Sequence, residues 1–534
     1  MDQKKAALSQ IGYAARNLLR TISNARRQRQ TPPDYVYYIL DGSYPELSAP
    51  RTEWWHHLLP VKDDSLQGLS AQLDLIAQDQ RVRGVVLHLR PLMMPLAHLQ
   101  TIRNLIKKLR DAGKRVIVWS HSYDTATYYV ASAADEILLQ PGGSVAPLGL
   151  NREFIFLADT LEQLGIEVEA LQITPYKSGP DMFTSQKFSD EAREMMTWLT
   201  DDAYADLIEG IAKGRNLTEE EAHALVDNAP YTDLQARDAG VVDMLLHEED
   251  LPTHLGSADE PAKLDLWENA QKALLYPPIS RSERYVALIR IEGGIISGKS
   301  RRPPPFDSPF PMPFGTQQQA GDLSVVQTAR ALLEDENAAA VVLFIESPGG
   351  SPTASEAMAA ALNKVASKKP LVAVMGSVAA SAGYYVATPA KWIIAQPGTL
   401  TGSIGVFMMK GITEGLLNKL KLHTEKITRG KRASLYTSNQ PFTDEEREIV
   451  VEGMQRTYDL FLERVATSRQ MTTEEADAVG GGRVWTGRQA KERGLVDQLG
   501  GLEQAFAKAR ELAGLPEDAP VREVAITKEY FPPK

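Results

Sequence analysis

No cysteine occurs anywhere in the 534 residues of this chain. Its absence excludes disulfide bonds, a thiolate nucleophile and any zinc site with sulfur ligands, although it does not fix the cellular compartment. An excess of positive charge is also missing, because the chain has 58 Lys and Arg residues and 69 Asp and Glu residues, which gives a net charge of −11. A balance of that sign argues against general nucleic-acid binding, so we expect no nucleic-acid partner.

A hydrophobic run of membrane-spanning character is absent as well. The uncharged windows 370–390 and 392–409 are rich in Gly, Ser, Ala, Thr and Pro, as buried strands and turns are. Residues 1–30 lack the apolar core of a signal peptide and carry seven Lys or Arg against one acid, a local charge of +6. Apolar residues recur between these charges at helical spacing: Ile11, Ala14, Ala15, Leu18, Leu19 and Ile22. We therefore predict a basic amphipathic helix, which either touches a membrane surface or packs on a partner.

An internal repeat is the main feature that the chain does contain. Three segments return 256 residues later: Val85-Val86-Leu87 at 341–343, Tyr128-Tyr129-Val130-Ala131 at 384–387, and Gln140-Pro141-Gly142 at 396–398. Further anchors return 254 residues later: Tyr204, Arg215 and Thr218 as Tyr458, Arg469 and Thr472, and residues 235–243 as 489–497. A nearly constant offset over so many anchors indicates that one structural unit is used twice.

Each copy is predicted to alternate strands with helices and to end in a long helix. In the first copy these elements fall at 35–40, 69–78, 84–89, 97–112, 115–119, 136–139 and 189–213. In the second copy they fall at 285–291, 324–335, 340–345, 353–367, 371–375, 392–395 and 443–467. Apolar strands that alternate with helices favour an α/β fold in which mostly parallel sheets are covered by helices.

The domain boundaries follow from the repeat. We predict an N-terminal helix at 1–30, a first repeat at 31–250, a connector at 251–280 with a helix near 262–275, a second repeat at 281–510 and a tail at 511–534. The proline-rich segment Arg301–Asp322 is predicted to be a mobile loop that lies over a cleft.

The two copies differ at two turns. Ser381 follows an apolar strand in a turn of small residues, and its counterpart in the first copy is Thr125 (381 − 256). The loop SPGGS at 347–351 corresponds to PLMMP at 91–95, so its two glycines replace two methionines. Glycines after a strand allow backbone N–H groups to face a ligand, as in an oxyanion hole. The joint difference favours Ser381 as a nucleophile over a serine that only caps a helix.

A nucleophilic serine needs a base, and histidine is scarce in the second copy. His423 is the only histidine there, in a polar stretch well past the turn, so a histidine triad is poorly supplied but not excluded. Lys177, in the first copy, sits among small and uncharged residues. Burial would lower the pKa of such a lysine and make it a base, whereas the alternative is an ordinary surface lysine.

The motifs SPGGS, VAASAGYY, TGSIG and YKS together resemble the long, duplicated form of the signal peptide peptidase A (protease IV) family, peptidase family S49, within the Clp and crotonase-like superfamily. The resemblance implies a Ser–Lys dyad with Ser381 as nucleophile and Lys177 as general base. It implies that Ser403 orients the lysine and that Gly349, Gly350 and Ala382 form the oxyanion hole. It further implies apolar peptide substrates, a homotetramer, and no metal or other cofactor.

Two features depart from the family pattern and leave alternatives open. No N-terminal membrane anchor is evident, so we predict a location in the cytoplasm or peripheral on the cytoplasmic membrane. The segment YKSGPDMF differs from the commoner YKSA-x-E-P-F, which affects the surroundings of Lys177. The rival hypotheses are a crotonase-type acyl-CoA hydratase or isomerase, for which no glutamate base or adenine pocket is evident, and a non-catalytic oligomeric scaffold.

Overall fold

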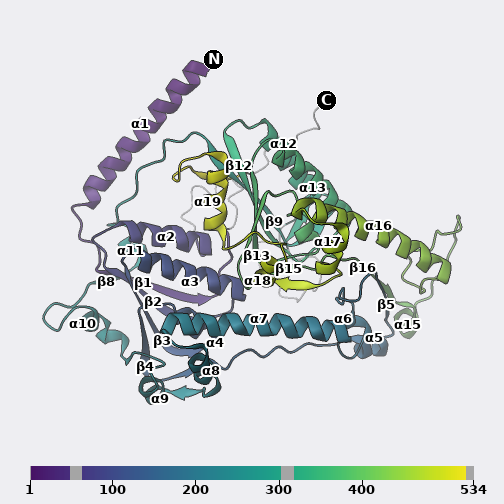
Figure 1. Ribbon diagram of the computed structural model, residues 1–534, viewed down its shortest axis with the longest axis horizontal. Coiled ribbons are helices and arrows are strands. Elements are labelled where there is room, and N and C mark those ends of the chain that lie inside the picture. Colours follow the sequence, from purple (N-terminus) through teal and green to yellow (C-terminus); the bar gives the residue numbers. More distant parts are fainter. Residues whose placement is uncertain (1, 49–62, 302–317, 525–534) are drawn as a thin grey trace. The chain divides into compact units, whose positions relative to one another are not determined.

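The computed structural model describes residues 2–48, 63–301 and 318–524. The chain divides into two compact units. Unit 1 comprises Met1–Leu150, Ala203–Arg284 and Pro516–Pro520, and unit 2 comprises Asn151–Asp202, Tyr285–Leu515 and Val521–Lys534. Each unit has its own sheet, shown among the elements of Figure 1.

Unit 1 contains a seven-stranded sheet with the order β6-β4-β3-β2-β1-β8, and β7 pairs with β4. Its strands are β1 (Tyr35–Gly42), β2 (Gly84–Leu92), β3 (Arg115–Asp124), β4 (Glu136–Ala146), β6 (Tyr231–Thr232), β7 (Met244–Leu245) and β8 (Leu264–Leu266). All described pairings in it are parallel except that of β4 with β6. Its helices are α1 (Asp2–Arg27), α2 (Leu66–Gln78), α3 (Leu96–Asp111), α4 (Thr125–Ala131), α8 (Glu219–Asp227), α9 (Asp233–Asp238), α10 (Leu251–Leu255) and α11 (Trp267–Ala270), with a 3-10 turn, η2 (Glu248–Asp250).

Unit 2 contains an eight-stranded sheet with the order β17-β15-β13-β12-β9-β19, and β14 lies between β13 and β18. Its strands are β9 (Tyr285–Glu292), β12 (Ala338–Ser347), β13 (Leu371–Ala380), β14 (Trp392–Ala395), β15 (Leu400–Gly402), β17 (Val484–Thr486), β18 (Gln498–Leu499) and β19 (Val521–Glu523). Its helices are α5 (Ala158–Leu164), α6 (Asp181–Thr184), α12 (Asp322–Glu334), α13 (Pro352–Ala366), α14 (Ala382–Tyr385), α15 (Glu414–Lys419), α16 (Asp444–Arg469), α17 (Thr473–Val479), α18 (Gly487–Glu492) and α19 (Leu502–Ala513). The helix α7 (Asp190–Arg215) begins in unit 2 and ends in unit 1.

Two small two-stranded sheets complete unit 2. One pairs β10 (Gly294–Ile296) with β11 (Gln319–Gly321). The other is an antiparallel ribbon of β5 (Glu167–Gln172) and β16 (Phe407–Ile412), which we call the arm ribbon. Because β5 comes from the first sequence repeat and β16 from the second, the segment Asn151–Asp202 leaves its own repeat and folds with unit 2.

The predicted fold class is confirmed, because both main sheets are mostly parallel and alternate with helices along the chain. Each unit buries a separate apolar core: Ile102, Ile106 and Leu109 belong to that of unit 1, whereas Leu343, Met358 and Leu362 belong to that of unit 2. The predicted strands and helices of both repeats are present, and a helix forms over Asp2–Arg27. In the described part of the chain, every helix is too short or too polar to cross a lipid bilayer.

The prediction of a helix near 262–275 is wrong over most of that range. Leu264–Leu266 forms β8, which pairs in parallel with β1, and only Trp267–Ala270 is helical. The alternation Leu-Asp-Leu suits an edge strand, and Trp267, the first residue after β8, stacks its ring on Tyr38 at 5.9 Å between centroids. The expected tail at 511–534 adds a strand, since Val521–Glu523 pairs with β9. Residues 302–317 of the proline-rich segment lie outside the described residues.

Candidate active site

Ser381 lies at a sharp turn between β13 and α14. Its backbone adopts φ 55° and ψ −120°, a conformation that L-residues rarely occupy and that is held here by a hydrogen bond from its N–H to the Gly402 carbonyl at 2.8 Å. Its hydroxyl makes no capping hydrogen bond to α14, although Ser381 is the residue that precedes the helix. The side chain is therefore available for chemistry, as in a strained strand-to-helix nucleophile turn.

Lys177 is buried beside this serine, with only 4% of its surface exposed. Its Nζ lies 3.0 Å from Ser381 Oγ, 2.8 Å from Ser403 Oγ and 2.5 Å from the Ser403 carbonyl oxygen. Desolvation by burial lowers the pKa of Lys177 from 10.5 to about 7. At neutral pH a large share of the molecules thus carries an uncharged amine at this position.

The three contacts of Lys177 can be made by the ammonium form, with three donors, and also by the neutral amine. Such an amine has two N–H donors and one lone pair, whereas the ammonium form has three donors and no acceptor. The two N–H groups can donate to the Ser403 carbonyl and Ser403 Oγ. The lone pair then faces Ser381 Oγ and can accept its proton, which is the arrangement that a general base requires.

The arm ribbon explains how residues far apart in sequence meet here. Its strands are antiparallel, and Gln172 at the end of β5 pairs with Phe407 at the start of β16. Lys177 follows β5 by five residues, and Ser403 precedes β16 by four residues. Both therefore leave the ribbon at the same end, and Figure 1 shows β5 and β16 side by side.

Gly349 and Gly350 form the loop after β12 and both have positive φ, at 124° and 149°. A Cβ on Gly349 would lie 2.9 Å from Ser381 Cβ, and a Cβ on Gly350 would lie 2.1 Å from the Ile295 carbonyl oxygen. A side chain at either position would disrupt the site, so glycine is required by both conformation and space.

The loop at Gly349–Gly350 and the first turn of α14 both adjoin Ser381. The Gly349 N–H donates to Ser347 Oγ at 3.2 Å, which fixes the loop. Gly350 lines the same cavity as Ser381. Ala382 follows the nucleophile as the first residue of α14, where backbone N–H groups have no partner within the helix. These are the group types from which oxyanion holes are built.

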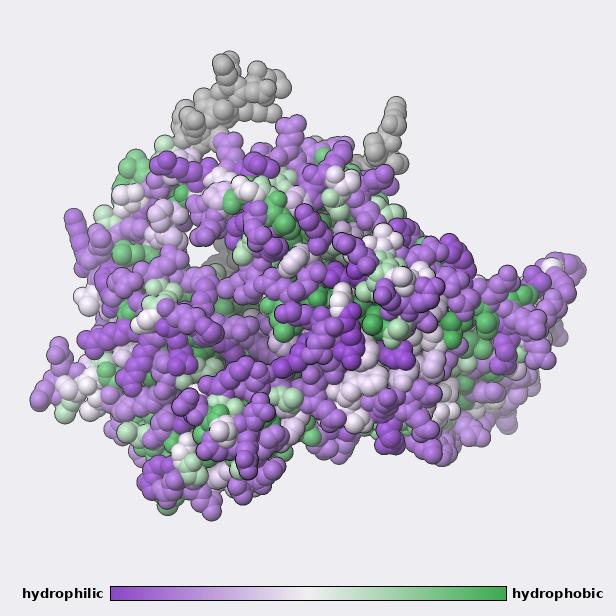
Figure 2. Space-filling model, in the orientation of Figure 1, coloured by the Kyte–Doolittle hydropathy of each residue, from purple (hydrophilic) through white to green (hydrophobic). Residues whose placement is uncertain are grey.

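A cavity of about 490 Å³ opens beside these residues. Lys177, Ser381 and Ser403 line one part of it, and the remainder is mainly apolar, with Phe154, Ile155, Phe156, Met182, Phe188 and Phe407 among its walls. The Phe188 ring contacts Phe154 and Phe156 edge-on, at 4.8 and 5.1 Å between centroids. Phe407 and Met409 of β16 are exposed, and apolar residues gather at the surface over β5 and β16 in Figure 2.

The structure brings together all six residues proposed from the sequence: Ser381, Lys177, Ser403, Gly349, Gly350 and Ala382. The other candidate base, His423, is exposed and does not line the cavity. The aromatic wall at 154–156 and 188 was not predicted. A signal for it exists in the sequence, since the apolar run 154–158 (FIFLA) directly follows the polar residues Asn151, Arg152 and Glu153.

Comparison with known proteins agrees with the internal repeat. A family model described as peptidase family S49 matches residues 108–260 and again residues 363–516. The two matched segments begin 255 residues apart (363 − 108), which agrees with the offset of the internal repeat.

Relatives align along most of the chain. "Serine protease SPPA, chloroplastic" from Arabidopsis thaliana is 30% identical over 473 residues, which is 87% of this chain and 68% of that protein. "Protease 4" from Haemophilus influenzae is 30% identical over 475 residues, covering 85% of this chain and 73% of that protein. "Protease 4" from Salmonella typhi is 29% identical with the same coverage. Among solved structures, a ClpP1 mutant from Listeria monocytogenes matches with a TM-score of 0.25 and 14% identity, over 41% of this chain and 94% of that chain.

Proposed function

This chain belongs to peptidase family S49, and on that premise we propose that it is a serine endopeptidase in which Lys177 activates Ser381. The observation that carries the proposal is the 3.0 Å contact between Lys177 Nζ and Ser381 Oγ. Burial of the lysine supports it, because only a neutral amine can take the serine proton.

The proposed reaction is acyl transfer. Lys177 accepts the Ser381 hydroxyl proton as the oxygen attacks a peptide carbonyl, and the N–H groups of Gly350 and Ala382 stabilise the oxyanion that forms. The Lys177 ammonium then protonates the departing amine, and the C–N bond breaks to leave an ester on Ser381. Water, deprotonated by the same lysine, hydrolyses this ester. Ser403 holds the amine through both of its oxygens, so that the lone pair keeps its direction.

We propose that the substrates are apolar peptides, such as released signal peptides or unfolded polypeptide segments. The support is the wall of the cavity, in which Phe154, Phe156 and Phe188 offer apolar area beside the nucleophile. Apolar side chains gain free energy when they leave water for such a surface.

Two variants test the dyad. Ser381→Ala and Lys177→Ala should each abolish hydrolysis of casein or an apolar peptide, and a fluorophosphonate probe should label Ser381 in the native chain but not in Ser381→Ala. Lys187→Ala is the matched control, since this exposed lysine lies in the same segment. Full hydrolysis by Lys177→Ala would contradict the dyad. Hydration of an enoyl-CoA thioester by both the native chain and Ser381→Ala would favour the crotonase-type alternative instead.

A further inference from the structure

The N-terminal helix α1 docks on unit 1 through a polar face. From Tyr13 onward, half-buried positions recur at helical spacing at Tyr13, Asn17, Arg20, Asn24 and Arg27, and Ser23 beside them is half-buried too. None of these side chains is aliphatic, so this is the reverse of an ordinary amphipathic helix, which buries its apolar stripe.

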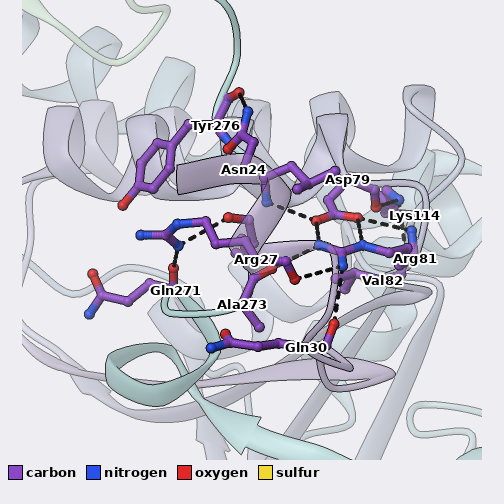
Figure 3. A network of polar contacts seen from close by, with 12 residues as sticks. Asn24, Arg27, Gln30, Asp79, Arg81, Val82, Lys114, Gln271, Ala273 and Tyr276 are labelled. Atoms are coloured by element: carbon purple, nitrogen blue, oxygen red, sulfur yellow. Dashed lines mark hydrogen bonds and ion pairs between the residues drawn. The ribbon is translucent and has the colours of Figure 1, made fainter. Parts of the chain in front are cut away.

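The docked face is held by specific contacts (Figure 3). Asn24 exchanges two hydrogen bonds with the Tyr276 backbone, at 2.9 and 3.1 Å. The guanidinium groups of Arg20 and Arg27 lie over the Tyr276 ring, at 4.7 and 4.5 Å from its centroid. Arg27 also donates to the carbonyls of Gln271 and Leu274. These contacts fix the helix at its C-terminal turns.

A second layer of the network supports the last turn. Arg81 pairs with the buried Asp79 at 2.7 Å and donates to the carbonyls of Arg27 and Gln30. Its remaining donor reaches the Ala273 carbonyl at 2.8 Å. Arg81 therefore contacts both the end of α1 and the segment 271–276.

The opposite face of α1 is apolar and exposed. Leu18, Leu19 and Ile22 are 61%, 67% and 58% exposed, and Figure 2 shows apolar side chains at the surface of this helix. With 100° of rotation per residue, the centre of these three lies about 170° from the centre of the five docked positions. The contacts in unit 1 thus leave this stripe facing outward.

The charge of this segment indicates what covers the stripe. Seven Lys or Arg and no acid occur between Gln3 and Pro33, whereas residues 31–534 carry a net charge of −17 (−11 − 6). Arg26 is exposed on the same side of α1 as the stripe, and Arg29 is exposed two residues after the helix ends. Leucine and isoleucine flanked by basic residues fit the boundary between acyl chains and anionic headgroups.

We propose that α1 is a docking helix for an anionic lipid bilayer, which it enters with Leu18, Leu19 and Ile22 while its polar face keeps the protein attached. A bilayer can cover the stripe without breaking any docked contact, because the two faces are opposed. A second copy of α1 fits less well, since pairing two stripes would bring two strongly basic segments together.

Vesicle sedimentation with the full chain tests the proposal. We expect binding to vesicles of phosphatidylcholine mixed with phosphatidylglycerol, weaker binding to phosphatidylcholine alone, and weaker binding in high salt. The triple variant Leu18→Ser, Leu19→Ser, Ile22→Ser should bind anionic vesicles at least about tenfold more weakly. Leu234→Ser removes another exposed leucine of unit 1 and is the matched control. Peptide hydrolysis in solution should be unchanged in both variants, which separates this test from that of the dyad.

Three results would overturn the proposal. One is an absence of binding to either kind of vesicle by the native chain. Another is undiminished vesicle binding by the triple variant when its helix content and unfolding temperature match the native chain. In the third, the native chain elutes as an oligomer on size exclusion, the triple variant elutes as a smaller species, and neither binds lipid. The stripe would then be covered by a second copy of the chain.

Discussion

At the scale of single residues, the pKa of Lys177 links burial to activity. Because burial lowers this pKa to about 7, the fraction of neutral amine rises with pH through that value. We expect kcat/KM for an apolar peptide to rise between about pH 6 and 8, to be half-maximal near 7 and then to level off. The rate at which a fluorophosphonate labels Ser381 should follow the same curve. A midpoint above 9 would show that the lysine is not desolvated in the working enzyme.

The same burial costs stability at low pH. In the unfolded chain Lys177 keeps its ordinary pKa of 10.5, so between pH 7 and 10.5 the folded state binds fewer protons than the unfolded state. Folding therefore becomes more favourable as pH rises through this window, and the penalty is largest below 7. We expect Lys177→Met to raise the free energy of unfolding on the order of 3 kcal/mol at pH 6 and by less at pH 9.

Urea denaturation at the two pH values measures this difference. Lys421→Met is the control, because it removes an exposed lysine of the same unit and should give no pH-dependent gain. An equal gain for Lys177→Met at both pH values would contradict the link between its burial and its charge.

Glu346 holds the end of the strand that leads to Ser381. β13 pairs with β14 up to Met375 and with β15 from Val378, and the carboxylate of Glu346 lies at this change of partner. It accepts the N–H of Ser377 at 2.6 Å and of Val378 at 3.2 Å, and the Ser377 hydroxyl at 2.5 Å. The first repeat has Arg90 at the equivalent position (346 − 256), so this support is confined to the copy that carries Ser381.

We expect Glu346→Gln to lower kcat about 10- to 100-fold, since an amide offers one acceptor oxygen in place of two and tilts the turn that presents Ser381. Glu346→Asp keeps both oxygens and should retain more activity. Steady-state kinetics and the rate of fluorophosphonate labelling should fall together, while the pH midpoint stays near 7 because Lys177 is untouched. A lower unfolding temperature with unchanged kcat would reduce Glu346 to a structural role.

At the scale of elements, the arm ribbon positions Lys177 beside Ser381. Leu171 of β5 is buried with Phe442, Val450 and Met454 in a small cluster of its own. Leu171→Ala should cost about 2–5 kcal/mol locally, because it opens a cavity where the ribbon packs. We expect hydrolysis to fall and the region around Lys177 to exchange amide hydrogen faster, as hydrogen exchange would measure.

An exposed leucine of the same arm supplies the comparison. Leu164 of α5 is 49% exposed, so Leu164→Ala should leave both exchange and hydrolysis near native levels. If Leu171→Ala keeps full activity, the ribbon is not what holds Lys177 in place.

The elements also show how far the sequence could predict this site. Ser381, Gly349 and Gly350 were predicted because the first repeat lacks them, and an internal comparison needs no structure. The uncharged neighbours of Lys177 point to it as a candidate. Its contact with Ser403, however, depends on the pairing of β5 with β16, which lie about 240 residues apart in the sequence. No local sequence pattern determines that these two strands pair. The helix predicted in the connector is wrong for the same kind of reason, since Leu264–Leu266 forms a strand by pairing with β1, which lies far away in the sequence.

At the scale of the whole molecule, the site belongs to one unit although its residues come from both repeats. Lys177 and Ser381 both lie in unit 2, and the two cores share no residue. Duplication thus supplied two similar folds, and the segment Asn151–Asp202 of the first repeat brings Lys177 into the unit formed mainly by the second. Activity should accordingly follow the stability of unit 2.

Substitutions in the two cores separate the units. Leu362→Ala, in unit 2, should lower the free energy of unfolding by about 2–5 kcal/mol and lower the temperature at which hydrolysis is lost. Ile106→Ala, in unit 1, should destabilise its unit by a similar amount and lower a calorimetric transition. Hydrolysis by Ile106→Ala should nevertheless persist up to the temperature at which the native chain loses it. Leu323→Ala and Leu234→Ala, at exposed positions of units 2 and 1, should change neither. Equal loss of hydrolysis in both core variants would mean that the two units unfold together. Destabilising the core of unit 1, which contains neither Ser381 nor Lys177, would then abolish activity as readily as destabilising the core of unit 2.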